Sequence, residues 1–225
     1  MSGYKLVIFD LDGTLLDTSE GILNAVRYTI DQCGLQTLSE EKIKKFIGPP
    51  IQESFQRAYG IEDTDKLQEL ATIFRDRYKG SDLYKAKPYP GIYRTCETLQ
   101  EAGILLAVAT YKREDYAVNL LRHFGFDKYM TAMYGADHEN KLKKADIIQK
   151  CLDLLDDPYR QNVRENAVMV GDTENDSLGA QRAGVDFIGV TYGFGFRDKS
   201  ELLTPGCAGG ADSAEELSEL ILGHV

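Results

Sequence analysis

The chain has 225 residues, of which 43% are hydrophobic and 28% are charged, and this composition suits one large globular domain or a core with a smaller domain. Its formal net charge of −10 and the lack of a basic block argue against a nucleic-acid polymer as partner. The longest apolar stretches, such as residues 104–109, are too short to cross a bilayer, so no membrane partner is expected.

The cysteines and the N-terminal residues indicate in which cellular compartment the protein is expected. The four cysteines are scattered and form no C-x-x-C pair, which indicates neither a zinc site nor a disulfide framework. The first residues show no signal-peptide pattern. We therefore expect a cytoplasmic protein.

The first predicted element is a buried strand over Tyr4–Phe9, and two carboxylates, Asp10 and Asp12, follow it directly. Two like charges so close together are costly unless a cation neutralises them or one of them holds a proton. A nucleophilic carboxylate, a second carboxylate that moves a proton, and a metal ion between them would explain the pattern.

The segment from Asp17 to about Asp82 has only helical patterns. Asp17 and Glu20 are suited to opening a helix, apolar residues recur at helical spacing from Ile22 to Cys33, and Gly34 ends it. Shorter amphipathic segments follow at residues 40–46, 51–59 and 65–78. The sequence therefore predicts an all-helical domain, residues 17–82, inserted into an α/β domain formed by residues 1–16 and 83–225, with the proline-containing segment 87–91 as a stiff linker.

After the linker, strand and helix patterns alternate. The expected strands are residues 104–109, 130–134, 167–170 and 186–191. The expected helices are residues 91–102, 114–124, 145–155, 176–183 and 213–222, the last with Ser213 and Glu216 at capping-box spacing. Strands that are apolar on both faces and alternate with helices predict a parallel sheet covered by helices.

Polar groups follow three of the predicted strands. Asp10 follows the first, Thr110 ends the strand at 104–109, and Asp172 comes after Gly171 at the end of the strand at 167–170. Because ligands of parallel sheets bind at the carboxyl ends of strands, we expect these groups to converge. Asp172 and Asp176 are suited to a hard cation, although Asp176 is equally suited to capping the helix predicted to start there.

A phosphate site also needs positive charge. Three lysines precede the helix at 145–155, namely Lys141, Lys143 and Lys144, and one of them is expected to offset the carboxylates and a phosphate. The loop Gly193-Phe194-Gly195 lacks the third glycine of a dinucleotide fingerprint and is read as support for the sheet edge.

In this order, the motifs resemble those of the haloacid dehalogenase superfamily. They are Asp10-Leu11-Asp12-Gly13-Thr14-Leu15, Thr110, a lysine, and Gly171-Asp172 with Asp176. The resemblance spans nearly the whole chain, and the helical insert resembles that superfamily's mobile helical cap. Residues 47–50, 89–92 and 188–195 are similar to its phosphoglycolate-phosphatase-like and nucleotidase-like members.

The resemblance implies a Rossmann-like core and an activity: Mg²⁺-dependent hydrolysis of a small phosphomonoester, such as a phosphoglycolate-like compound or a nucleoside monophosphate. Asp10 would become an aspartyl phosphate and Asp12 would move the protons. Magnesium would bind Asp10, the backbone carbonyl of Asp12, Asp172 and Asp176. The phosphoryl oxygens would be bound by Thr110 and Lys144, with Lys143 as the alternative to Lys144. The backbone amides of Leu11, Asp12 and Tyr111 would be further donors.

Other activities of the same superfamily compete with this one. Asp12 argues against dehalogenation, which needs no acid, whereas a sugar phosphomutase and a non-catalytic phosphate-binding scaffold stay open. The cap turn Gly48-Pro49-Pro50 and the nearby Arg57 are expected to select the leaving group. The expected partner is a small phosphorylated metabolite, and the expected assembly is a monomer or a homodimer.

Overall fold

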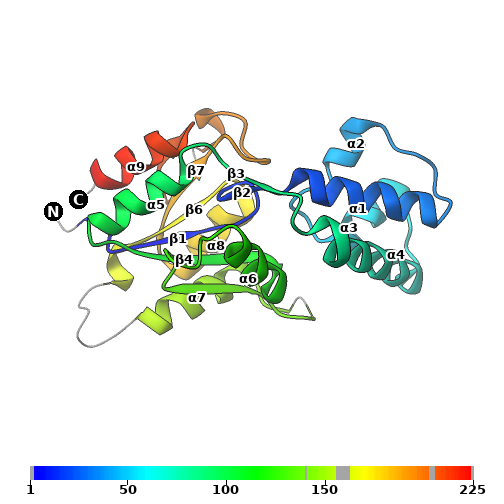
Figure 1. The fold of residues 1–225 in the computed structure, drawn as a ribbon, viewed down its shortest axis with the longest axis horizontal. Coiled ribbons are helices and arrows are strands. Elements are labelled where there is room, and N and C mark those ends of the chain that lie inside the picture. Colours follow the sequence, from blue (N-terminus) through cyan, green and yellow to red (C-terminus); the bar gives the residue numbers. More distant parts are fainter. Residues whose placement is uncertain (1–2, 140, 156–162, 203–205, 224–225) are drawn as a thin grey trace. The chain divides into compact units, whose positions relative to one another are not determined.

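The computed structural model describes residues 3–139, 141–155, 163–202 and 206–223 (Figure 1). The chain divides into two compact units, one formed by Met1–Asp17 with Pro88–Val225 and the other by Thr18–Lys87. The sequence placed the second unit at residues 17–82, and the structure extends it to Lys87.

The first unit is built on a six-stranded sheet with the order β5-β4-β1-β6-β7-β8. Its strands are β1 (Leu6–Phe9), β4 (Leu105–Arg113), β5 (Ala132–Ala136), β6 (Ala167–Gly171), β7 (Asp186–Val190) and β8 (Cys207–Ala211). Every neighbouring pair is parallel, which confirms the predicted fold class. Some details of the sheet differ from the sequence prediction: β1 begins at Leu6 rather than Tyr4, and β4 continues beyond Thr110 to Arg113. Strand β5 lies at 132–136 rather than 130–134, and β8 was not predicted.

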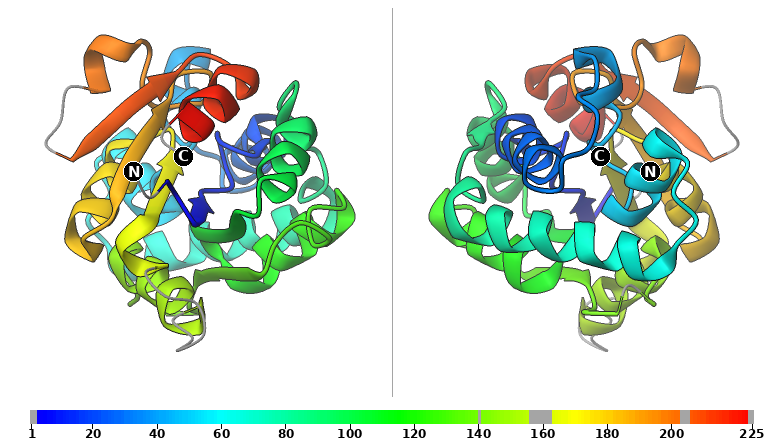
Figure 2. Two further views of the ribbon diagram at one scale, coloured as in Figure 1. Left: turned by 90° about the vertical axis from the view of Figure 1, so that its left-hand side faces the viewer. Right: turned by 90° about the vertical axis from the view of Figure 1, so that its right-hand side faces the viewer.

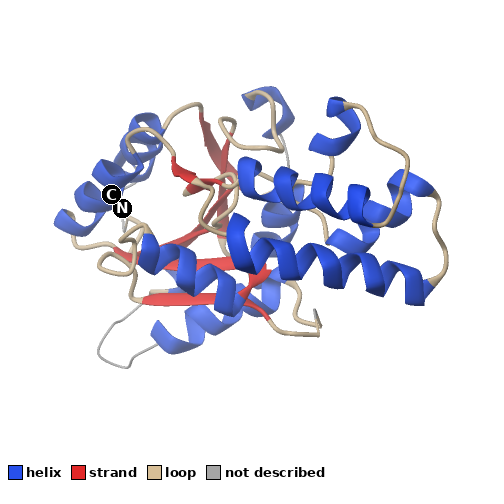
Figure 3. Ribbon diagram, turned by 45° about the vertical axis from the view of Figure 1, so that its right-hand side comes forward, coloured by secondary structure: helices blue, strands red, loops and turns tan. Residues whose placement is uncertain are grey.

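Helices cover this sheet. They are α5 (Ile92–Glu101), α6 (Glu114–His123), α7 (Lys144–Leu155), α8 (Glu174–Ala183) and α9 (Ala214–Gly223), with short 3₁₀ segments at Arg164–Asn166 and Lys199–Leu202. Figures 1 and 2 show α5 and α9 together on one side of the sheet and α7 and α8 on the other. Figure 3 shows the same layers, with the strands in red between blue helices. Burial on both faces explains the continuous apolar runs of the central strands.

The register of the sheet aligns three strand ends. All four residues of β1 are fully buried, and Phe9 pairs with Val108 of β4 on one side and Val170 of β6 on the other. The residues that follow these three positions therefore share one edge of the sheet. Asp10, Thr110 and Asp172 all come within two residues of them.

The second unit is helical. It contains α1 (Ser19–Gln32), α2 (Glu40–Lys44), α3 (Ile51–Tyr59), α4 (Thr64–Arg77) and a π-helical turn over Tyr78–Asp82. Thr18, rather than Asp17, stands at the start of α1, whereas Asp63 caps α4 by accepting the backbone N–H groups of Asp65 and Lys66. In its interior the rings of Phe46 and Phe55 meet edge to face, 5.0 Å apart. Among the described residues, no helix combines the length and apolar composition that a membrane span requires.

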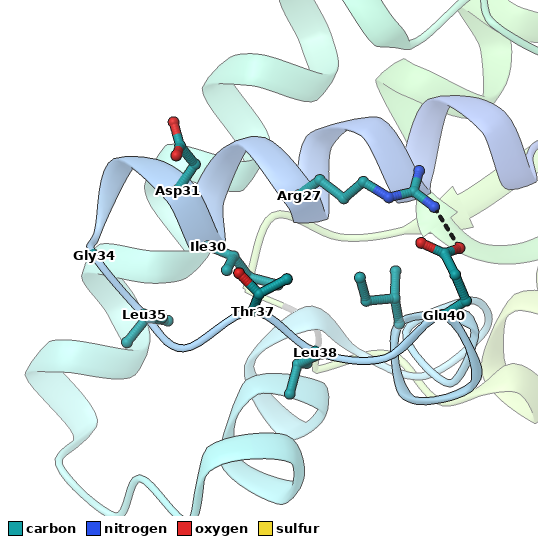
Figure 4. A pocket seen from close by; sticks show the side chains of 9 residues that line it. Arg27, Ile30, Asp31, Gly34, Leu35, Thr37, Leu38 and Glu40 are labelled. Atoms are coloured by element: carbon teal, nitrogen blue, oxygen red, sulfur yellow. Dashed lines mark hydrogen bonds and ion pairs between the residues drawn. The ribbon is translucent and has the colours of Figure 1, made fainter.

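A hollow of about 400 Å³ lies between α1 and α2 (Figure 4). Its apolar lining comes from Ile30, Leu35, Leu38 and Ile43. At its rim the Nη2 atom of Arg27 lies 2.7 Å from Oε2 of Glu40, and Figure 4 shows the two side chains pointing toward each other. This ion pair links α2 to α1. Because both side chains are largely exposed, it contributes little to the free energy of folding.

The chain leaves and re-enters each unit at neighbouring points. Leu16–Asp17 (β2) and Lys87–Pro88 (β3) pair as a two-stranded sheet. In the α/β unit the backbone N–H of Tyr89 donates to the carbonyl of Leu15, at 3.2 Å. In the helical unit the N–H of Gly21 donates to the carbonyl of Lys85, at 3.0 Å. The two ends of the inserted segment therefore lie close together.

A buried carboxylate fixes the end of the helical unit. Asp82 is fully buried, and its Oδ2 accepts a hydrogen bond from Nε of Arg77 at 2.8 Å. Its Oδ1 lies 2.8 Å from Nζ of Lys85. Both cations keep more than a third of their side chains exposed, whereas the carboxylate itself is shielded from water. The buried charge of Asp82 therefore depends on these two cations to offset it.

Replacing Asp82 by Asn is expected to lower the free energy of unfolding by about 2 kcal/mol, because two charge-assisted contacts lose their charge. Urea unfolding followed by circular dichroism measures the change. The matched control is Asp76→Asn, which removes the exposed pair with Lys79 and is expected to change the free energy by no more than about 0.5 kcal/mol. Equal effects of the two substitutions would contradict this assignment.

Candidate active site

Asp10 lies at the carboxyl end of β1 in the centre of the sheet. Its backbone N–H donates to the carbonyl of Val170 at 2.8 Å, which fixes it against β6. Its side chain is buried, and Oδ1 lies 2.6 Å from Nζ of Lys144. The structure therefore gives this carboxylate a fixed position beside a cation.

Lys144 is the first residue of α7 and is buried, whereas the neighbouring Lys143 is exposed. Its Nζ also lies 2.6 Å from Oδ1 of Asp176, so one ammonium group contacts two carboxylates. A Cβ at Gly179 of α8 would collide with the Lys144 side chain, so this glycine makes room for it. Burial opposes the charge of Lys144, but Asp10 and Asp176 outweigh burial and raise the pKa of the amine above its usual value.

Asp172 follows β6 and is completely buried. Its Oδ2 accepts a hydrogen bond from the backbone N–H of Phe194 at 2.7 Å. Among the described residues no group donates to its other oxygen, Oδ1. A buried carboxylate oxygen without a donor is costly, which points to a cation as its missing partner.

Two glycines allow the chain to pass close to Asp172. Gly13 has φ +85°, and a Cβ there would collide with the Asp172 carboxylate. A Cβ at Gly193 would collide with the Gly13 carbonyl and with Asp172. The interpretation of the loop at 193–195 as mere support for the sheet edge was therefore wrong, because this loop encloses and hydrogen-bonds a site carboxylate.

Asp176 caps its own helix and also contacts Lys144. Helix α8 begins at Glu174 with Thr173 as N-cap, so the expected start at Asp176 was wrong by two residues. Oδ2 of Asp176 accepts hydrogen bonds from the N–H of Thr173 at 3.0 Å and from its hydroxyl at 2.6 Å, which completes a capping box. Its Oδ1 remains directed at Lys144.

Burial and neighbouring carboxylates raise the pKa of Asp10 and of Asp172. Burial is the largest cause of the raised pKa of Asp10, with Asp176 and Asp12 adding to it and Lys144 opposing it, and the result is about 6. Burial, followed by the charges of Asp176 and Asp10, raises the pKa of Asp172 well above its usual value. Both groups would ionise more readily beside a further cation.

Asp10, Asp172 and Asp176 form a set of buried oxygens suited to a metal ion. Each offers one carboxylate oxygen, and these oxygens lie within 4.8 Å of one another. Because the donors are all hard oxygens and one of them has no partner, the set fits Mg²⁺ better than a softer metal. The residues present therefore fit the ion that the sequence led us to expect.

Asp12 lies beside a lysine that the sequence analysis did not single out. Its Oδ2 is 3.0 Å from Nζ of Lys112, which comes from β4 and is only 7% exposed. Asp12 is more accessible, with 17% of its side chain exposed. Lys112 was missed because the predicted strand ended near Thr110, whereas β4 continues to Arg113.

The remaining predicted phosphate ligands lie at the same edge. Thr110 is buried, and its Oγ1 accepts a hydrogen bond from the N–H of Lys112 at 3.2 Å. The ring of Tyr111 is 38% exposed, and its centroid lies 5.7 Å from Nζ of Lys144. The carbonyl of Leu11 accepts the backbone N–H groups of the next turn, from Thr14, Leu15 and Leu16.

The predicted specificity residues all belong to the helical unit. Gly48 has φ +101°, Pro49 follows it, and Pro50 is the N-cap of α3. The guanidinium of Arg57 donates to the carbonyl of Lys45 at 3.0 Å, so this side chain helps to hold α3 against the end of α2.

Comparisons with known proteins place this geometry among enzymes. A family model described as haloacid dehalogenase-like hydrolase matches residues 7–190. A 5′-nucleotidase from Pseudomonas aeruginosa is 35% identical over 197 residues, covering 87% of this chain and 86% of its own. A phosphoglycolate phosphatase from Agrobacterium fabrum is 34% identical over 193 residues, covering 84% and 81%. The crystal structure of a predicted phosphatase from Clostridium acetobutylicum matches with a TM-score of 0.87 and 34% identity, over 99% of this chain and 100% of that one.

Proposed function

The chain belongs to the haloacid dehalogenase-like hydrolase family, as its motifs led us to expect, and from this premise we propose that it is a Mg²⁺-dependent phosphatase acting through an aspartyl phosphate on Asp10. The observation that carries the proposal is the buried contact of Asp10 with Lys144, beside the unpartnered oxygen of Asp172. A carboxylate held in place next to positive charge is suited to attack an anionic phosphoryl group.

In the first half of the reaction, a carboxylate oxygen of Asp10 attacks phosphorus and the bond to the leaving oxygen breaks. Asp12 gives its proton to that oxygen, so the product leaves as an alcohol. Lys144 offsets the phosphoryl charge. Because the Thr110 hydroxyl oxygen accepts the N–H of Lys112, its own proton is oriented away and can be donated to a phosphoryl oxygen.

In the second half, Asp12, now a carboxylate, takes a proton from water, and the resulting hydroxide attacks phosphorus. The bond between phosphorus and Asp10 breaks, which releases inorganic phosphate and restores both aspartates to their initial states. Splitting the hydrolysis into two displacements is the advantage of a covalent intermediate.

Magnesium would be held by Asp10, Asp172 and the backbone carbonyl of Asp12, with Asp176 orienting this set. When bound, it would offset the negative charge of the nucleophile and of the phosphoryl group. The unpartnered Oδ1 of Asp172 supports this assignment.

The affinity for Mg²⁺ is expected to fall as the pH is lowered. The pKa of Asp10 is raised to about 6, so at pH 5 only about a tenth of the molecules carry the ionised form that binds a cation. Calorimetric titration at pH 7.5 and pH 5 should therefore show an affinity at least about 10-fold weaker at the lower pH, with protons released on binding. Equal affinity at the two pH values would contradict the raised pKa.

The substrate is proposed to be a small phosphomonoester of the phosphoglycolate or nucleoside monophosphate type, which the names of the two curated relatives support. The test is phosphate release from a panel that contains phosphoglycolate, pyrophosphate, nucleoside monophosphates, hexose phosphates and an aryl phosphate, with and without Mg²⁺. Metal-dependent release would support the phosphatase, and the best substrate would define its branch. Isomerisation of a sugar phosphate without net release would instead indicate a mutase, and no turnover of any kind a scaffold.

A further inference from the structure

We propose that Lys112 is a positioning residue that holds the carboxyl group of Asp12 for both of its proton transfers. The inference rests on the proposed function, in which Asp12 is the acid and then the base. Its physical basis is the 3.0 Å contact between Nζ of Lys112, at the end of β4, and Oδ2 of Asp12, in the loop that follows the neighbouring strand β1.

Lys112 requires an oxygen acceptor for its ammonium group at the position where it lies. Its side chain is 7% exposed, so the ammonium group has lost most of its water, and a buried cation is stable only when it is paired. The backbone N–H of Lys112 donates to Oγ1 of Thr110 at 3.2 Å, which holds the two residues together at the end of β4, where the register with β5 shifts. The long flexible stem of lysine then allows the ammonium to reach the loop after β1, where Asp12 lies.

The two buried lysines of the site contact different carboxylates. Lys144 contacts Asp10 and Asp176, whereas the ion pair of Lys112 is formed with Asp12. The backbone of Asp12 is fixed by its bridge to Leu16, and 17% of its side chain is exposed. The ammonium group of Lys112 can donate to Oδ2 of Asp12 both when the carboxyl group holds its proton and when it is ionised. Because a displacement of 1 Å in a reacting group costs about 100-fold in rate, a contact that fixes this carboxyl group matters for proton transfer.

This role predicts a dependence on the leaving group. An alkoxide must be protonated as it leaves, whereas p-nitrophenolate is stable without a proton. Loss of Lys112 should therefore slow the first displacement with an alkyl phosphate and leave it nearly unchanged with p-nitrophenyl phosphate. The second displacement needs Asp12 as base, so it should slow equally after either substrate.

The experiment compares wild type with Lys112→Met, which keeps the length of the side chain and removes its charge. With Mg²⁺ present at pH 7, single-turnover quenched flow measures alcohol release and phosphate release separately for an alkyl phosphate and for p-nitrophenyl phosphate. We expect alcohol release from the alkyl phosphate to fall about 10- to 100-fold and release of p-nitrophenolate to change less than about 3-fold. Phosphate release should fall about 10- to 100-fold with both substrates.

Two further variants make the result interpretable. Lys128→Met removes an exposed lysine of the α/β unit and is expected to change none of these rates. Lys112→Gln, which retains a hydrogen-bond donor, is compared in the same way and replaces Lys112→Met if that variant does not fold. Circular dichroism and the thermal midpoint check the fold of each variant.

Equal losses of alcohol release from both substrates would overturn the proposal, because they would indicate that Lys112 grips the phosphoryl group or only supports the fold. Unchanged rates in both displacements would overturn it as well. The proposed function fails in a different way: wild type would form no phosphoenzyme, or Asp12→Asn would release phosphate at the wild-type rate. That result concerns Asp12 itself and would remove both proposals together.

Discussion

Replacing Asp10 by Asn is expected to lower turnover by about 10⁴-fold or more and to abolish phosphoenzyme formation. The amide has nearly the shape of the carboxylate but is not a nucleophile toward phosphorus. The loss should appear in kcat rather than in KM, because Lys144 and Thr110 still bind the phosphoryl group. Acid quenching after mixing with labelled substrate, followed by mass spectrometry of the protein, measures the covalent intermediate directly.

The matched control is Asp127→Asn, an exposed aspartate in the turn after α6, which should retain wild-type turnover and phosphoenzyme. Circular dichroism should show both variants folded. A covalent phosphate on the Asp10→Asn variant would place the nucleophile elsewhere and would end the assignment of Asp10.

Replacing Lys144 by Met is expected to lower kcat by about 10³-fold, since the phosphoryl oxygens lose a charged donor in a buried site. It should also lower the free energy of unfolding in the absence of metal by about 3–5 kcal/mol, because Asp10 and Asp176 would remain buried without their cation. Saturating Mg²⁺ should recover part of this stability by binding the folded state. Chemical unfolding with Mg²⁺ and with a chelator measures both effects.

The control for this experiment is the adjacent Lys143→Met, whose side chain is exposed and which should affect neither activity nor stability. The two variants together distinguish the alternatives that the sequence left open. A large loss at Lys143 with little change at Lys144 would reverse the choice that the geometry supports.

The parts of the fold that follow from local pattern could be predicted from the sequence. The parallel sheet could be predicted because its strands are apolar on both faces. The first acidic motif could be recognised as part of a site because it comes directly after β1. Strand β8 escaped prediction because Gly209 and Gly210 lie in its centre, and glycine weakens a strand pattern. At Gly210 the lack of a side chain makes room for Leu202, because a Cβ there would collide with the end of the Leu202 side chain.

The contacts that tune the site depend on tertiary structure. The donor to Asp172 is the backbone N–H of Phe194, and a backbone amide has no signature in the sequence. Which of Lys143 and Lys144 reaches the site depends on the residue at which α7 begins, and helix ends are hard to predict from sequence. It also depends on Gly179, whose missing side chain leaves room for Lys144. Lys112 could have been found by extending β4 beyond Thr110, which the sequence pattern alone did not justify.

The neighbouring ends of the insert have a consequence for folding kinetics. The central strands β1 and β4 pair Leu6 with Leu105, so the whole helical unit lies between two segments that must meet. A long loop is entropically costly to close, and such distant pairings slow folding. Once the helical unit has formed, its own Gly21–Lys85 hydrogen bond brings its two ends together, and the loop that remains to be closed is short. Formation of the helical unit is therefore expected to reduce the loop entropy that is lost when β1 pairs with β4, in spite of the length of the insert.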